Sequence, residues 1–193
     1  MPNEDFHVHG AHDHAVEHGA RHGGADTLPG RVAVISAVLA TLGALMTFAG
    51  GDTQAKAQLY KNTATITKTH ENDKWNEYQA EGIKYHLAKT AADLQSHADK
   101  AEWYLSEAQR YRMQQAELKE ESLKLEEEVK QWDERSEKQM HEHHRWALGA
   151  TAMQIAIALS AIALLARKTW LLYGVGAVAA AGLVFGGMAV AGV

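Results

Sequence analysis

Long apolar runs and one long polar stretch alternate along this chain of 193 residues. A bilayer core about 30 Å thick needs roughly 20 apolar helical residues to cross it. The apolar runs meet that length. Arg31 is the only charged residue within them, and Arg167 and Lys168 lie between the last two runs. We therefore predict three membrane-spanning helices with the lipid bilayer as their solvent, at residues 31–50, 147–166 and 171–193.

The polar stretch, residues 51–146, is predicted to be helical throughout. After Gly51 it contains no proline and a single glycine, Gly82, and it is rich in Ala, Glu, Lys, Gln and Leu. Both of its ends join membrane spans, so it must fold back on itself, and residues 94–100 ("LQSHADK") have the composition of a turn. The sequence thus predicts an all-α membrane protein with three transmembrane helices and a long extra-membrane antiparallel helical hairpin, a coiled coil.

The second arm of this hairpin carries a heptad pattern with mostly apolar or aromatic residues at alternating three- and four-residue spacing. Such a period predicts left-handed coiled-coil packing, either against the first arm or against a neighbouring subunit. Polar members of the pattern weaken the packing and fix its register. The predicted seam consists of Ala101, Tyr104, Ala108, Tyr111, Gln115, Leu118, Ser122, Leu125, Val129, Trp132, Ser136, Gln139, His143 and Trp146.

The first arm has weaker heptads but one aromatic cluster around a small residue. Trp75, Tyr78, Gly82 and Tyr85 fall on one helix face at spacings of three, four and three. A glycine inside an exposed helix costs about 0.5–1 kcal/mol relative to alanine, so we expect Gly82 to admit a close neighbour. We interpret the cluster as a packing contact between the arms, because aromatic stripes at helical spacing usually pack, with a ligand cage as the alternative.

Two segments of the chain resemble the bacterial membrane family known as domain of unknown function 4337. They are "KWNEYQAEGIKYHLAKTAADL", residues 74–94, and "MQIAIALSAIALLARKTWLLYG", residues 153–174. The matching positions are Trp75, Tyr78, Gln79, Ala80, Ile83 and Lys84 in the first segment, and Arg167, Lys168 and Trp170 in the second. Glu81 stands where the family usually has a lysine, and Gly82 where it has a larger residue. The resemblance implies a bacterial inner-membrane protein with three spans and brings no established activity.

The basic residues beside the spans predict how the chain is threaded. Arg31 and the short turn at 167–170, with Arg167 and Lys168, lie on the same side of a three-span protein, and short basic segments stay in the cytoplasm. The N-terminal tail is then cytoplasmic, while the hairpin and the C-terminus are periplasmic. Trp170 is placed at the headgroup level. The basic residues that flank the other ends of the first two spans favour the inverse threading, which is the alternative.

The tail, residues 1–30, is rich in histidine, and we expect it to be disordered. Flexible imidazole-rich segments bind transition metals such as Zn, Cu or Ni, so a metal is the one cofactor that the tail indicates. The alternative is a tail that chelates metal only weakly and without a physiological role. The candidate ligands are His7, His9, His12, His14, His18 and His22.

Small residues in the spans favour close helix packing. Gly182 and Gly186 form a G-x-x-x-G motif, a spacing compatible with packing within one chain and with contact between chains. Gln154 is the only strongly polar residue near the middle of a span. Spans with so few polar groups argue against ion conduction, although a pore lined by Thr41, Thr47, Gln154 and Ser160 is conceivable.

Composition excludes several other kinds of site. The chain has no cysteine, which excludes disulfides, thiolate metal ligands and cysteine nucleophiles. Its formal net charge is −5 and no basic stripe dominates any segment, so we expect no nucleic-acid partner. With no catalytic constellation and no indicated small-molecule substrate, we expect a non-enzymatic, self-associating inner-membrane scaffold, as a homo-oligomer or an accessory subunit of a larger assembly. A metal-binding membrane protein and a channel-like oligomer are the alternatives.

Overall fold

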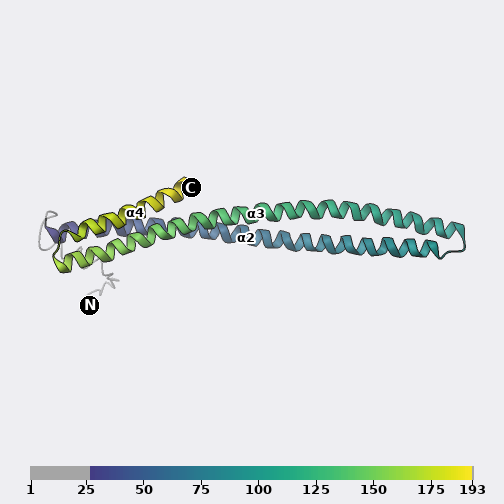
Figure 1. Ribbon diagram of the computed structural model, residues 1–193, viewed down its shortest axis with the longest axis horizontal. Coiled ribbons are helices and arrows are strands. Elements are labelled where there is room, and N and C mark those ends of the chain that lie inside the picture. The colour runs from purple at the N-terminus through teal and green to yellow at the C-terminus, as the bar shows by residue number, and fades with distance from the viewer. Residues whose placement is uncertain (1–26, 193) are drawn as a thin grey trace, which may run out of the picture. The chain divides into compact units, whose positions relative to one another are not determined.

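The computed structural model describes residues 27–192 of the chain, and their regular structure consists of three long helices (Figure 1). These are α2 (Leu28–Asp93), α3 (Ala98–Ala166) and α4 (Leu171–Ala191). No strand occurs among the described residues, so the all-helical class is confirmed. Each helix contains a stretch long and apolar enough to cross a membrane.

The predicted boundaries between spans and hairpin arms are not breaks in the helices. α2 continues through Gly50 and Gly51, and α3 continues through Trp146 and Ala147. No proline interrupts either helix at these points, and Pro29 lies in the first turn of α2, where a missing N–H costs nothing. Where the side chains change from apolar to polar, the expected surroundings of the helix change from lipid to water, while its backbone stays helical.

The chain forms two compact units, which are described separately. Within the described residues, one comprises residues 27–55 and 139–192, here called the apolar unit. The other is Lys56–Lys138, here called the hairpin unit.

In the hairpin unit, α2 and α3 pack antiparallel. The Ser136 hydroxyl donates to the Ala57 carbonyl at 2.9 Å, and the Gln115 amide donates to the Tyr78 carbonyl at 3.3 Å. Partner numbers thus fall along α3 as they rise along α2, and the helices lie side by side (Figure 1). The connection between them lies at residues 94–97, within the stretch with turn composition.

Small side chains occupy nearly all of the fully buried positions of the hairpin unit. Ala57 is 1% exposed, Ala64 3% and Ser122 0%. Larger residues such as Trp132 are only half-buried. The two backbones therefore approach closely at the small positions, and the larger side chains close the edges of the contact. Every position of the predicted seam from Ala101 to Ser136 is buried or half-buried.

The α2 side of this contact is a heptad stripe that the sequence analysis missed. Its members, here called the inner stripe, are all buried or half-buried and follow three- and four-residue spacing without a break. They are Ala57, Tyr60, Ala64, Thr67, Glu71, Lys74, Tyr78, Glu81, Tyr85, Ala88 and Ala92.

Glu71 is the charged exception among the buried positions. Its side chain is 4% exposed, and the Lys68 ammonium donates to its carboxylate at 2.6 Å. We expect Lys68→Met to lower the stability of the hairpin unit by about 1–2 kcal/mol, because a buried carboxylate loses its ionic donor. Hydrogen–deuterium exchange of the amides in 56–138 of the full-length protein in detergent measures this.

Lys124→Met is the matched control for Lys68→Met. Lys124 also pairs with a carboxylate on its own helix, but its partner Glu120 is 71% exposed on the side chain. Exposed pairs of this kind contribute little to stability, so the control should leave amide exchange nearly unchanged. Equal effects of the two substitutions would contradict a special role for the buried Glu71 carboxylate.

The apolar unit has a core of methionine, leucine and small residues contributed by all three helices. Met153 is fully buried, and Met46 and Leu39 are 6% and 5% exposed. The hydroxyls of Ser36 and Ser160 share a hydrogen bond of 2.7 Å between α2 and α3. Polar groups inside this core are therefore satisfied by one another, as an environment without water requires.

Glycines bring α4 onto α3 in this unit. A Cβ at Gly149 would lie 3.1 Å from the Gly182 carbonyl oxygen and 3.4 Å from the Gly186 nitrogen. A Cβ at Gly186 would lie 2.7 Å from the Met46 methyl carbon. The G-x-x-x-G motif therefore packs inside one chain, against α3 and α2, which is one of the two arrangements that its spacing allowed.

Candidate functional site

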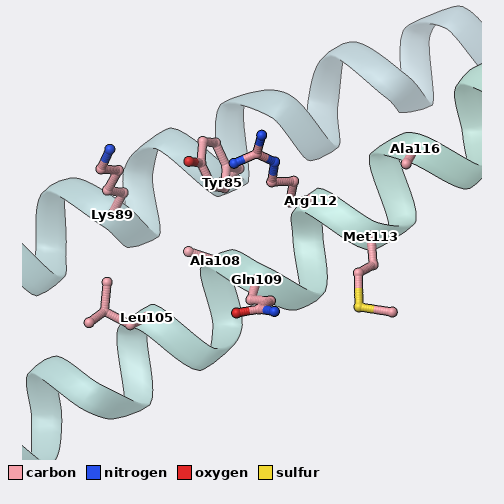
Figure 2. Close-up of a pocket in the computed structure, with 8 residues that line it drawn as sticks. All are labelled: Tyr85, Lys89, Leu105, Ala108, Gln109, Arg112, Met113 and Ala116. Carbon is pink, nitrogen blue, oxygen red and sulfur yellow. The ribbon is translucent and has the colours of Figure 1, made fainter.

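The end of the hairpin unit near the turn carries two grooves between α2 and α3. The larger has a volume of about 690 Å³. Figure 2 shows its lining side chains, with Tyr85 and Lys89 on α2 and the rest on α3. The lining residues are Tyr85, Lys89, Leu105, Ala108, Gln109, Arg112, Met113 and Ala116.

Apolar and cationic groups share this larger groove. The side chains of Leu105 and Met113 are 52% and 68% exposed, so the groove has unburied apolar walls. The Arg112 guanidinium lies 5.8 Å from the centre of the Tyr85 ring, within cation–π range. Such a groove offers apolar contact area and positive charge, with no carboxylate, thiol or imidazole in its lining.

The smaller groove, of about 300 Å³, lies beside an aromatic and charged network. Leu87 and Trp103 line it and are 69% and 57% exposed. Lys84 donates to Glu81 at 2.7 Å and sits 5.8 Å from the centre of the Tyr111 ring. The hydrogen bond to the Glu81 carboxylate raises the pKa of Lys84, so this lysine is held in its charged form. These groups pair among themselves, which indicates a structural role.

The predicted aromatic cluster lies in the α2–α3 contact. None of its four residues is exposed, and the rings of Trp75 and Tyr78 meet edge to face at 5.4 Å. A Cβ at Gly82 would lie 2.5 Å from the Gln115 amide nitrogen, so Gln115 is the neighbour that this glycine admits. The cluster packs between the helices, and no ligand cage is formed by its members.

The predicted topology anchors lie at the ends of the apolar unit's helices. Arg31 is in the first turns of α2, and Arg167, Lys168 and Trp170 form the exposed turn between α3 and α4. Arg167 has φ 52°, the one left-handed non-glycine residue among those described. The Lys168 amide donates to the Ala163 carbonyl and the Arg167 amide to the Leu164 carbonyl, both at 3.3 Å. This is the hydrogen-bond pattern of a Schellman cap, which glycine usually closes.

We expect Arg167→Gly to stabilise the apolar unit by about 1 kcal/mol, because glycine adopts the left-handed conformation without the steric penalty of a side chain. The apparent Tm of the full-length protein in detergent measures this. Lys168→Gly is the matched control, because Lys168 does not have a positive φ and gains nothing from the exchange. A lower Tm for Arg167→Gly than for the wild type would contradict the strain argument.

Other predicted polar sites are not assembled within the described part of the chain. Ser160 is buried against Ser36, whereas Thr41, Thr47 and Gln154 are exposed, so the four conceivable pore residues do not line one passage in a single copy. The six tail histidines, His7 to His22, lie outside the described residues. Residues 27–192 contain no group of three or more His, Asp or Glu able to hold a metal ion.

The histidines near the start of the predicted second span have structural contacts. The His143 Nδ1 atom donates to the Gly50 carbonyl at 2.8 Å, which links α3 to α2 and fixes the imidazole tautomer when the ring is neutral. The rings of His143 and His144 lie 5.9 Å apart. His143 therefore packs as a seam residue.

A surface feature of α2 went unnoticed in the sequence. Four large apolar side chains of this helix outside the predicted spans are more than half exposed, and so is Leu94, which directly follows the helix: Leu59, Ile66, Ile83, Leu87 and Leu94. The seven-residue steps from 59 to 66 and from 87 to 94 were the available signal, and the inner stripe of the same helix obscured it.

Comparison with known proteins places the chain in a family. The model of the family described as "Domain of unknown function (DUF4337)" matches residues 28–192. The chain belongs to this family. The match covers all three helices and both units of the DUF4337 fold seen here, including the aromatic cluster and the basic turn. No curated protein and no solved structure matches the chain.

Proposed function

We propose that this DUF4337 protein is a multi-pass protein of the bacterial inner membrane that self-associates and acts as a non-enzymatic scaffold or accessory subunit. The observation that carries the proposal is the exposed apolar surface of the hairpin unit. Leu59, Leu87 and Leu94 are 61%, 69% and 80% exposed, although they lie outside the stretches that a bilayer would cover. Apolar side chains in such numbers along one polar helix pair are typical of a protein contact surface.

The chemistry of the grooves supports a binding role over a catalytic one. Their lining residues supply apolar area and positive charge, and the ionisable side chains around Tyr111 are engaged in ion pairs with one another. A catalytic site needs a nucleophile, acid or base within reach of a substrate pocket. The grooves offer surfaces for another helix or an apolar segment.

Self-association is tested on the full-length protein extracted in mild detergent. We expect light scattering coupled to size-exclusion chromatography to give a protein mass of two or more copies. A strictly monomeric protein, with no protein partner recovered from native membranes, would overturn the proposal. Measurement over a range of protein concentrations separates weak association from none.

The basic turn supports one threading of the chain. The backbone of Arg167 has the left-handed conformation that favours glycine at the end of a helix. An arginine at this position supports a role for its positive charge in addition to ending α3. We propose that this turn and the tail face the cytoplasm, and that the hairpin unit and the C-terminus lie in the periplasm.

The absence of cysteine makes this threading directly measurable. We expect Ser96→Cys, in the exposed turn of the hairpin unit, to react with a membrane-impermeant maleimide in intact cells. Thr169→Cys, in the exposed basic turn, is the control and should react only after lysis. The reverse labelling pattern would show that the protein is inserted the other way round.

A further inference from the structure

The exposed apolar side chains of α2 form a second heptad stripe. It runs from Leu59 through Thr90 to Leu94, the residue that follows the end of α2, at alternating three- and four-residue spacing, and is called here the outer stripe. All of its positions are exposed, and it contains every large apolar residue of α2 within the hairpin unit that is more than half exposed. Its members are Leu59, Asn62, Ile66, Thr69, Asp73, Asn76, Ala80, Ile83, Leu87, Thr90 and Leu94.

Most of the outer stripe lies on the side of α2 that faces away from α3, while Thr69 and Leu87 also line grooves at the edge of the α2–α3 contact. It is shifted by two residues from the inner stripe, which corresponds to a rotation of about 200° around the helix. Since both stripes have the same period, a helix that packs on the outer stripe winds with α2 in the same left-handed sense as α3 does. The stripe is therefore shaped for a long helix lying along α2.

We propose that the outer stripe is covered by the outer stripe of a second copy of this chain, with the two α2 helices parallel and in register. This inference rests on the proposed function, since it names the surface through which the protein self-associates. The two α2 helices would form the centre of the dimer, and each α3 would pack on the outside.

α3 does not offer an equivalent stripe to serve as the partner. Its large exposed apolar residues in the hairpin unit are Trp103, Leu105, Met113 and Leu123. They are separated by two, eight and ten residues, so they do not form a stripe with alternating three- and four-residue spacing. Among the described residues of the hairpin unit, the outer stripe is thus the exposed heptad stripe that carries large apolar residues toward both of its ends, with polar Thr69, Asp73 and Asn76 in its middle. A two-fold contact would pair it with itself.

The polar residues of the outer stripe suit a parallel pair in register. Asn62 and Asn76 would meet their own copies, and asparagine amides in a seam can pair and fix register. The residues that flank the stripe would face each other without like charges: Gln58 with Thr63, Thr65 with His70, Asn72 with Glu77, Gln79 with Lys84, and His86 with Ala91. Asp73 would meet Asp73 of the second copy, which makes it the weak point of the contact.

The contact is tested with single cysteine substitutions in the full-length chain in its native membrane. The protein has no cysteine of its own, so any disulfide between two chains must come from the introduced residue. We expect Ile66→Cys and Leu87→Cys each to form covalent dimers on mild oxidation. Lys89→Cys is the matched control, because Lys89 is also exposed and lies two residues from Leu87 on another face of α2. Its dimer yield should be at least about tenfold lower, since disulfides require Cβ atoms about 4 Å apart.

Two further variants test direction and register. Co-expressed, differently tagged Leu59→Cys and Leu94→Cys chains should not cross-link to each other, because a parallel pair keeps these ends apart. A cross-link between them would show an antiparallel contact and overturn the proposal. Asp73→Leu should increase the fraction of dimer at a given detergent dilution, and no increase would count against the in-register pairing.

The experiments can distinguish a failure of the proposed contact surface from a failure of self-association itself. A wild-type protein that is monomeric throughout would overturn both. If the oligomer persists in the double variant Ile66→Glu, Leu87→Glu, and the single cysteines do not cross-link, the proposed surface is wrong while self-association stands, through the spans or through another partner of the stripe. Loss of the oligomer in the double variant together with cross-linking at 66 and 87 is the expected result.

Discussion

Gly149→Leu is expected to disrupt the packing of α4 on α3 and to lower the stability of the apolar unit by about 3 kcal/mol. The Cβ atom alone would lie 3.0 Å from the Met46 sulfur and 3.1 Å from the Gly182 carbonyl oxygen. The carbonyl belongs to the backbone of α4, so it can move only if the helix moves. Apolar helices in a bilayer associate through close packing, because the hydrophobic effect does not drive them together there. If Gly149→Leu prevents the close contact of α4 with α3, burial of other apolar surface does not compensate for the lost packing energy.

Gly176→Leu is the control for this substitution. Gly176 lies on α4, and no atom would come within 4 Å of a Cβ placed there. Leucine also favours helix over glycine, so this variant should match or exceed the wild-type Tm in detergent. If Gly149→Leu and Gly176→Leu had the same Tm, the glycines could not be the contact that holds α4 in place.

The membrane-competent helices were predictable from sequence because their signal is simple. A run of about 20 apolar residues gives the length of a span whatever the details of its packing. Which glycines of such a run face another helix was predictable only in part. The G-x-x-x-G spacing indicated Gly182, which meets α3, but it did not indicate that Gly149 is the residue it meets, and Gly176 on the same helix is open. The difference depends on how α4 is rotated against its neighbours, and that rotation is set by contacts such as those of Met46 and Met153.

The contact surfaces of the two hairpin helices also differed in how well the sequence predicted them. The α3 seam was predictable because Leu118, Leu125 and Val129 mark its period. The inner stripe of α2 was hidden because Glu71, Lys74 and Glu81 occupy contact positions, where their stems pack and their charged ends pair with lysines or glutamates nearby. A helix with apolar residues on two opposite faces also lacks the single amphipathic face that sequence patterns detect. The outer stripe, the surface proposed for self-association, was missed for this reason.

The close approach of α2 and α3 makes a second strong prediction, for the double variant Ala57→Leu, Ala64→Leu. Both side chains are almost fully buried in the inner stripe, and the Ala57 carbonyl accepts the Ser136 hydroxyl at 2.9 Å. Leucines there have no space unless the helices separate. We expect each substitution to cost about 1–3 kcal/mol and the amides of residues 56–138 to exchange faster throughout.

The neighbouring exposed residues of α2 provide the matched control for this variant. Gln58→Leu, Thr65→Leu adds two leucines one residue away, at exposed positions outside the inner stripe. The amide exchange of α2 against α3 should then stay close to that of the wild type. If the alanine variant were equally stable, the helices would have to pack through their larger side chains, and small residues would not set their separation. This pair of variants therefore tests whether the small residues of the inner stripe set the separation of α2 and α3.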